Sequence, residues 1–172
     1  MKLLLLFLCL ALLFSCSAQS PTNTEKLTQE EKTVEIKGLA VVMDGVCPYK
    51  VIRPEEASDE IIAAAKSIDT FLFYKLDTHI DIKNDFAKES ELEILVGNTN
   101  RPETKELLDS LKEGQYGIKQ IGKKIVIVGY DDEGTVEAVD WFVRSFIKTA
   151  EAKDDEPIYL DVYIEKEMIA GR

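Results

Sequence analysis

Short apolar runs alternate with amphipathic stretches along most of this chain. The clearest are residues 92–96 and 125–128, which end at Gly97 and Gly129 and are each followed by a polar turn and helical periodicity. A short apolar run closed by glycine and followed by a helical pattern is typical of a buried strand that leads into a helix. This doubled unit predicts an α/β domain.

Further segments fit the same architecture. Apolar residues at 34–43 and 49–52 predict two early strands, and the alternation at 79–82 predicts a short edge strand. Residues 115–128 predict a hairpin that turns at Gly122 in a type II′ turn, and 158–164 predict a final strand. Because helices and strands interleave while one hairpin is antiparallel, we expect a mixed β-sheet in an α/β (α+β) fold.

Three helices are expected, and their ends carry recognisable signals. A stripe at Ile61, Ala65, Ile68 and Leu72 predicts the first helix, with acidic residues at its start. Asn100 and Glu103 have the spacing of a capping box for the second helix, which Gly114 is expected to end. Asp131 or Asp132 caps the third helix.

The third helix has the widest apolar stripe. Phe142 lies on that stripe beside Val139, so we expect it to pack against the sheet, whereas Trp141 is one position round the helix and less buried. Gly129, which ends the preceding strand, is expected to have a positive φ or to pack closely against backbone. Both expectations concern packing, and neither Phe142 nor Trp141 is assigned to a site.

The first residues have the features of an export signal. Lys2 precedes an apolar run at 3–14, which is shorter than the ~20 residues that span a membrane. Cleavage could follow Ala18. Alternatively, Leu13-Phe14-Ser15-Cys16 resembles a bacterial lipobox in which Cys16 becomes the lipidated first residue, although Phe14 is bulkier than the residue usual there.

These signals give the expected organisation and location. We expect a signal peptide of lipoprotein type at 1–15, a polar linker at 16–33, the folded domain at 34–165 and a tail at 166–172. Loss of Lys2 with the leader lowers the net charge from −11 to −12. Such a chain repels nucleic acid and anionic lipid, so an exported protein would be held at the cell membrane by its lipid or else secreted.

No set of residues marks an active site. Residues 129–135 have the outline of a phosphate loop, but its lysine is missing and three acids would repel a phosphate. His79 is the only histidine and is expected at an edge or on the surface, and Cys47 is expected to be a small buried hydrophobe. Acids abound, but nothing marks two of them as a catalytic pair. The sequence therefore assigns no catalytic, cofactor-binding or metal-binding residue.

Several segments together resemble a known domain. Residues 49–54, 93–103, 116–119 and 122–129, with the helix that carries Ala138 and Phe142, look like the small α/β domain that precedes the catalytic barrel in β-N-acetylhexosaminidases and α-glucuronidases. The most specific piece is the I-L-V-G-N-T-x-R-P-E run at 94–103. The resemblance implies a mixed sheet with two helices on one face and an accessory role, because the family's catalytic Asp-Glu pair belongs to the barrel.

Two functions follow from this resemblance. The first is a non-catalytic, exported bacterial accessory domain of carbohydrate-active type that binds glycan weakly or docks to a partner enzyme. The alternative is the N-terminal domain of a truncated or split glycoside hydrolase whose barrel is encoded beyond Arg172. An in-frame barrel downstream of Arg172 would distinguish the second function from the first.

Overall fold

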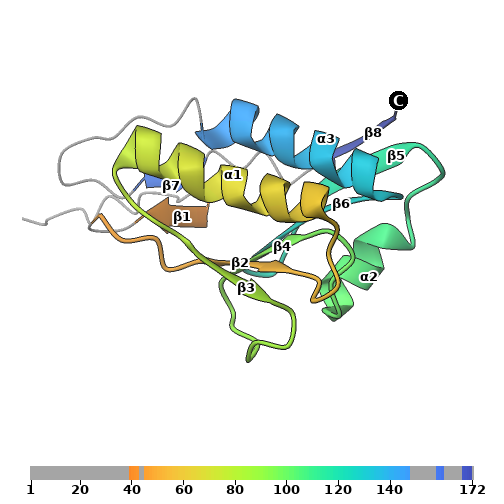
Figure 1. Cartoon of the computed structure of the whole chain (residues 1–172), viewed down its shortest axis with the longest axis horizontal. Coiled ribbons are helices and arrows are strands. Elements are labelled where there is room, and N and C mark those ends of the chain that lie inside the picture. The colour runs from red at the N-terminus through yellow and green to blue at the C-terminus, as the bar shows by residue number, and fades with distance from the viewer. Residues whose placement is uncertain (1–38, 43–44, 148–157, 161–167, 172) are drawn as a thin grey trace, which may run out of the picture. The chain divides into compact units, whose positions relative to one another are not determined.

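The computed structural model describes residues 39–42, 45–147, 158–160 and 168–171 (Figure 1). The elements follow in chain order: β1 (Leu39–Val42), β2 (Lys50–Arg53), α1 (Asp59–Leu76), β3 (Asp81–Asn84), β4 (Glu93–Val96), α2 (Pro102–Leu108), β5 (Gln115–Ile121), β6 (Lys124–Gly129), α3 (Asp132–Phe142), a π-helical turn (Val143–Ile147), β7 (Ile158–Leu160) and β8 (Met168–Gly171).

The main sheet is mixed, as the sequence predicts. Its strand order is β3-β2-β4-β6-β5-β8, and β1 and β7 form a separate antiparallel pair. The strands β3, β2, β4 and β6 are parallel, whereas β5 runs antiparallel to both β6 and β8. Every residue of β4 and β6 is buried, because both strands lie inside the sheet with a layer on each side.

Alternating side chains divide the core between the two faces of this sheet. Helices α1 and α3 lie side by side over one face, the helical face, and α2 covers part of the other, the α2 face (Figure 1). The sheet contributes Val51, Ile94, Val96, Ile125 and Ile127 to the helical face, and Ile52, Leu95, Val126 and Val128 to the α2 face. Two of the three helices therefore share one face, as expected.

The ends of α1 and α3 follow from their sequences. The Ser58 hydroxyl accepts a hydrogen bond from the Ile61 amide at the start of α1, and Asp77 ends that helix in the left-handed conformation with φ 49°. Of the two aspartates expected at the start of α3, Asp131 is the cap, because its carboxylate accepts from the Gly134 amide at 2.8 Å.

The expected capping box of α2 is wrong. Arg101 is the N-cap residue and makes no side-chain capping bond, while the Asn100 side chain donates instead to the backbone carbonyl of Asp85. The helix already ends at Leu108, so Gly114 does not terminate it. Gly114 has φ 75° in the turn before β5, where glycine adopts a left-handed conformation without a steric cost.

Gly129 is required by close packing and not by a positive φ. A Cβ added there would lie 2.3 Å from the backbone nitrogen of Thr135, at the first turn of α3. In the hairpin between β5 and β6, Gly122 has φ 60° while Lys123 is not among the residues with positive φ. That combination agrees with the expected type II′ turn.

The last residues differ from the expected tail at 166–172. Met168–Gly171 forms β8, an edge strand that pairs with β5. This segment is too short for its hydrophobic pattern to predict a strand. It becomes a strand by pairing with β5, a long-range contact that the local sequence pattern does not indicate. The leader, the linker and Cys16 lie outside the described residues. Among the residues that are described, no helix is long and apolar enough to cross a membrane.

Candidate functional site

The carboxyl ends of the parallel strands are the first place to look for a ligand. In an open α/β sheet, ligands bind where neighbouring crossovers leave in opposite directions, which here is between β2 and β4. One oxygen of Asp85 accepts from the Glu55 amide at 3.1 Å, and the other accepts from the Asn100 amide at 2.8 Å. The Asp85 carboxylate thus occupies two backbone N–H donors, those of Glu55 and Asn100, which an anionic ligand at this position would need.

The sequence run at 94–103 folds around the buried side chain of Arg101. Its guanidinium donates to the backbone carbonyls of Asp85 at 2.9 Å and Ala87 at 2.8 Å, and to the Glu93 carboxylate at 3.1 Å. Glu93 is fully buried at the start of β4. Arg101 therefore ties the crossover between β3 and β4 to the sheet, and the most specific part of the resemblance has a structural role here.

Lys124, the first residue of β6, joins the same set of charges. Its ammonium lies 3.6 Å from the Glu93 carboxylate and 2.9 Å from that of Glu103, and it also pairs with Glu89. Burial lowers the pKa of Lys124, but hydrogen bonds to Glu89 and Glu103 outweigh it and raise that pKa above its ordinary value. We call Glu89, Glu93, Arg101, Glu103 and Lys124 the ion network. Each of its three carboxylates faces at least one of its two cations, although one buried oxygen of Glu103 makes no hydrogen bond within the described residues. A ligand would have to displace these pairs to bind here.

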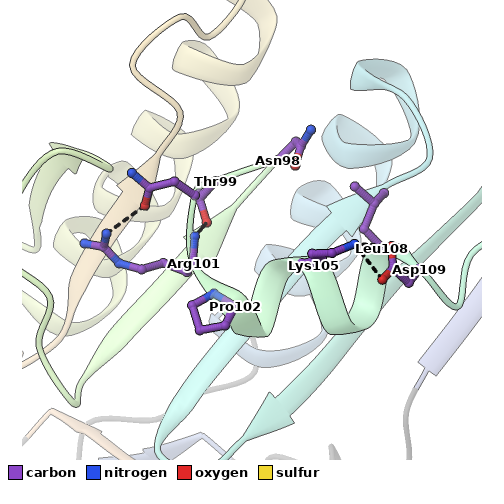
Figure 2. A pocket seen from close by; sticks show the side chains of 8 residues that line it. Asn98, Thr99, Arg101, Pro102, Lys105, Leu108 and Asp109 are labelled. Atoms are coloured by element: carbon purple, nitrogen blue, oxygen red, sulfur yellow. Dashed lines mark hydrogen bonds and ion pairs between the residues drawn. The ribbon is translucent and has the colours of Figure 1, made fainter.

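A hollow of about 350 Å³ lies beside α2 (Figure 2). We call it the turn hollow, and it is lined by Asn98, Thr99, Asn100, Arg101, Pro102, Lys105, Leu108 and Asp109. The Thr99 and Thr104 hydroxyls are hydrogen-bonded to each other at 2.6 Å, and Lys105 forms an ion pair with Asp109 at 2.8 Å. Because these groups already have partners within the domain, the turn hollow has few polar atoms left to recognise a ligand.

A second hollow, of about 420 Å³, has a different character. We call it the Trp141 hollow, and it is lined by Tyr116 of β5, Glu137, Asp140 and Trp141 of α3, and Arg144 and Ser145 of the π-helical turn. Two aromatic rings thus stand beside two carboxylates, a guanidinium and a hydroxyl. This combination can contact both the apolar and the polar parts of a small ligand.

Helical spacing places these side chains together. Glu137 and Trp141 are separated by four residues on α3, so they lie on the same side of the helix. Asp140 forms an ion pair with Arg144, again four residues later. The chain is wound as a π-helix from Val143 to Ile147, a rare geometry that occurs frequently at functional sites. Among the described residues, the Glu137 side chain forms no ion pair or hydrogen bond.

Cys47 and His79, the residues whose types suggested possible chemistry, lie away from the Trp141 hollow. Cys47 is buried, and burial raises the pKa of its thiol to about 11, so it remains protonated as the expected small hydrophobe. His79 is exposed, contacts Asp69 at 3.0 Å and stacks on Phe73 with ring centroids 4.8 Å apart. The structure brings neither residue into the Trp141 hollow.

The loop that resembles a phosphate site is closed by its own hydrogen bonds. The Thr135 hydroxyl accepts from the Gly129 amide at 2.8 Å, and the Asp131 carboxylate accepts from the Gly134 amide. These donors are therefore unavailable to a phosphate. In the parts of the chain that the structure describes, no group of three or more His, Cys, Asp or Glu residues could hold a metal ion.

Sequence reasoning missed the functional potential of Trp141. The residue is half-buried and packs against the core of the helical face, as expected, but it also lines the hollow. The helical spacing of Glu137, Trp141 and Arg144, across α3 and the π-helical turn that follows it, was a usable signal. The contribution of Tyr116 from β5 was not, because only the folded sheet brings it there.

Comparisons with known proteins find partial likenesses. No protein-family model and no curated protein matches the chain. One similar solved structure is a 4-O-methyl-α-glucuronidase of family 115 with specificity for decorated arabinogalactans, at 13% identity and a TM-score of 0.43 over 56% of this chain and 13% of that one. Another is a family 138 enzyme targeting pectin rhamnogalacturonan II, at 18% identity and a TM-score of 0.35 over 58% of this chain and 10% of that one. Both are glycoside hydrolases; at these scores the likeness assigns no activity to this chain.

Proposed function

We propose that this chain is an exported, non-catalytic accessory domain of carbohydrate-active type that binds glycan weakly in the Trp141 hollow. The observation that carries the proposal is the lining of that hollow. The resemblance of residues 94–103 and the neighbouring segments to an accessory domain of glycosidases supplies the carbohydrate context.

The lining suits a sugar ring. A pyranose presents C–H groups on one face, which pack on an indole or phenol ring, and hydroxyls around its rim, which hydrogen-bond to charged side chains. Trp141 and Tyr116 provide the rings, while Glu137 and Arg144 provide acceptors and donors. With so few contacts in a shallow hollow, the affinity is expected in the millimolar range, about −4 kcal/mol.

The same lining argues against hydrolysis in this hollow. Glycoside hydrolases flank the scissile bond with two carboxyl groups that approach it from different sides. Here Glu137 and Asp140 lie one turn apart on α3, and Asp140 is already paired with Arg144. Another close group of carboxylates, in the ion network, surrounds Lys124 and includes the fully buried Glu93.

Trp141 is the only tryptophan in the chain, so its fluorescence reports directly on this hollow. We expect saturable fluorescence changes when the whole protein is titrated with at least one member of a panel of neutral and charged oligosaccharides. Calorimetry should then show that Trp141→Ala weakens binding about 3- to 10-fold, the contribution of one stacked ring. Tyr74→Ala removes an exposed aromatic residue from α1 and should leave binding unchanged. Absence of saturable binding to every member of the panel would overturn the proposal.

The export part of the proposal has a separate test. If Cys16 is lipidated, Cys16→Ala moves the protein from the membrane fraction to the medium. Mass spectrometry of the mature N-terminus identifies the processed residue. A free N-terminus at Gln19 would refute the lipid anchor and leave simple secretion.

A further inference from the structure

The charges around the Trp141 hollow do not cancel. Asp140 and Arg144 form an ion pair and largely neutralise each other. Among the described residues, the Glu137 carboxylate has no ion-pair or hydrogen-bond partner, and it is only half-buried. The hollow therefore holds one uncompensated negative charge that a ligand can reach.

This accessible carboxylate is unlike those of the ion network. There, Glu93 and Glu103 face the ammonium of Lys124, and Glu93 also faces the guanidinium of Arg101. A cationic ligand would have to displace a lysine or an arginine to bind them. Among the described residues, no cation is paired with Glu137 that such a ligand would have to displace.

The position of Glu137 relative to Trp141 adds a second attraction for a cation. The two residues lie four apart on one side of α3, so a group at the edge of a ring stacked on Trp141 comes close to the carboxylate. A cation near the indole face is also attracted by the π-electrons of the ring. A ligand anion would meet Glu137 and, beyond it, a chain with a net charge of −11.

We infer, building on the proposed function, that the Trp141 hollow selects glycans whose sugars carry a free, protonated amine. Glu137 binds the ammonium group, and Trp141 stacks on the ring that carries it. Glycans with N-acetylated or unsubstituted neutral sugars bind more weakly, and glycans with uronic acids bind weakest.

The test uses Trp141 fluorescence of the whole protein with three oligosaccharides of equal length. These are oligomers of glucosamine, of N-acetylglucosamine and of galacturonate, titrated at low salt and at a pH where the amine is protonated. We expect the glucosamine oligomer to bind about 3- to 10-fold more tightly than the N-acetylated one. We expect no saturation with the galacturonate oligomer, and the preference should shrink as salt screens the charges.

Two variants separate a specific contact from general attraction to an acidic protein. Glu137→Gln should remove the preference for the amine while leaving binding of the neutral oligomer within about twofold. Glu133→Gln removes the same charge from an exposed position on α3 and should keep the preference. Equal binding of the glucosamine and N-acetylglucosamine oligomers would overturn this inference and leave the proposed function intact. Loss of the preference in both variants alike would also overturn it, whereas no binding of any oligosaccharide, in this set or in the wider panel, would overturn the proposed function itself.

Discussion

The two faces of the main sheet are stabilised by different means. On the helical face, α1 with 18 residues and α3 with 11 cover the strands, and the core there is an apolar cluster. On the α2 face, the helix has only 7 residues, about 10 Å of rise, which is too short to cover the parallel strands. Among the described residues, the buried cluster on this face comprises Ile52, Leu95, Leu107, Leu111, Val126 and Val128.

The crossover from β3 to β4 is held on the α2 face by polar contacts. It has no helix, its Phe86 side chain is exposed, and Arg101 binds its backbone at Asp85 and Ala87. Apolar burial is non-directional and tolerates small rearrangements, whereas buried charges depend on each partner being present. We therefore expect the helical face to respond to changes of volume, and the α2 face to respond to changes of charge and pH.

The largest effect is expected on the helical face, where Gly129→Ala places a methyl group against the backbone at the start of α3. The added Cβ would lie 2.3 Å from a backbone nitrogen, so β6 and α3 must move apart. Urea unfolding should show a greater loss than for any side-chain truncation described below. Gly114→Ala is the control, because no atom lies within 4 Å of its added Cβ, although φ there is 75°. Equal losses for the two variants would contradict the close packing of Gly129.

The second prediction tests which side of α3 packs on the sheet. Phe142 is fully buried, so Phe142→Ala should lower the free energy of unfolding by ~3–5 kcal/mol. Trp141 is half-buried, and Trp141→Ala should cost less. Urea unfolding measures both, provided that the slopes match the wild type. If the Trp141 variant is the less stable one, the assigned packing face of α3 is wrong.

The third prediction concerns the α2 face. Arg101→Leu leaves the buried Glu93 carboxylate without its guanidinium and should cost about 3 kcal/mol. Adding Glu93→Leu to that variant should restore part of the loss, because the buried carboxylate that has lost its closest cation is then removed. Hydrogen exchange should also report faster exchange of amides in residues 85–91 in the single variant. Equal stability of the single and double variants would show that charge does not dominate this face.

The fourth prediction uses pH to compare Lys124 with an exposed lysine. The raised pKa of Lys124 means that its contribution to stability is present at neutral pH and is lost as pH rises through the folded-state value. Hydrogen bonding to Lys124 lowers the pKa of Glu89, so the same contact is also lost as pH falls through the folded-state value of that carboxyl group.

The stability gap between wild type and Lys124→Met should therefore be widest near neutral pH and shrink at both extremes. Lys105→Met removes an exposed pair with Asp109 and should change stability by at most about 0.5 kcal/mol at neutral pH. Denaturant unfolding across the pH range measures both gaps. A gap for Lys124→Met that does not vary with pH would contradict the ion network.

The sequence predicted those features that depend on local periodicity. Apolar spacing correctly predicted the strands β2, β4 and β6 and the helices α1 and α3. It also correctly predicted that Phe142 is more buried than Trp141. The cap of α2 was predicted wrongly because Asn100 has a partner 15 residues away at Asp85, which outcompetes a local bond. Contacts at that separation leave no periodic trace.

The ion network and the Trp141 hollow could not be predicted from the sequence for the same reason. Lys124 and Glu89 are 35 residues apart in the chain, and nothing in the run at 94–103 indicates which acids its arginine will meet. The hollow needs Tyr116 of β5 beside α3, which only the sheet order creates. Sequence patterns thus gave the scaffold, and long-range pairing created the sites.

The most direct test of glycan binding in the Trp141 hollow is amide and indole chemical-shift mapping during titration with the glycan that binds best. If glycan binds in the Trp141 hollow, the single indole resonance, from Trp141, and the amides of residues 137–145 shift together and saturate, while the amides of residues 98–109 around the turn hollow do not move. Saturable shifts confined to residues 98–109, with the Trp141 indole unchanged, would contradict binding in the Trp141 hollow.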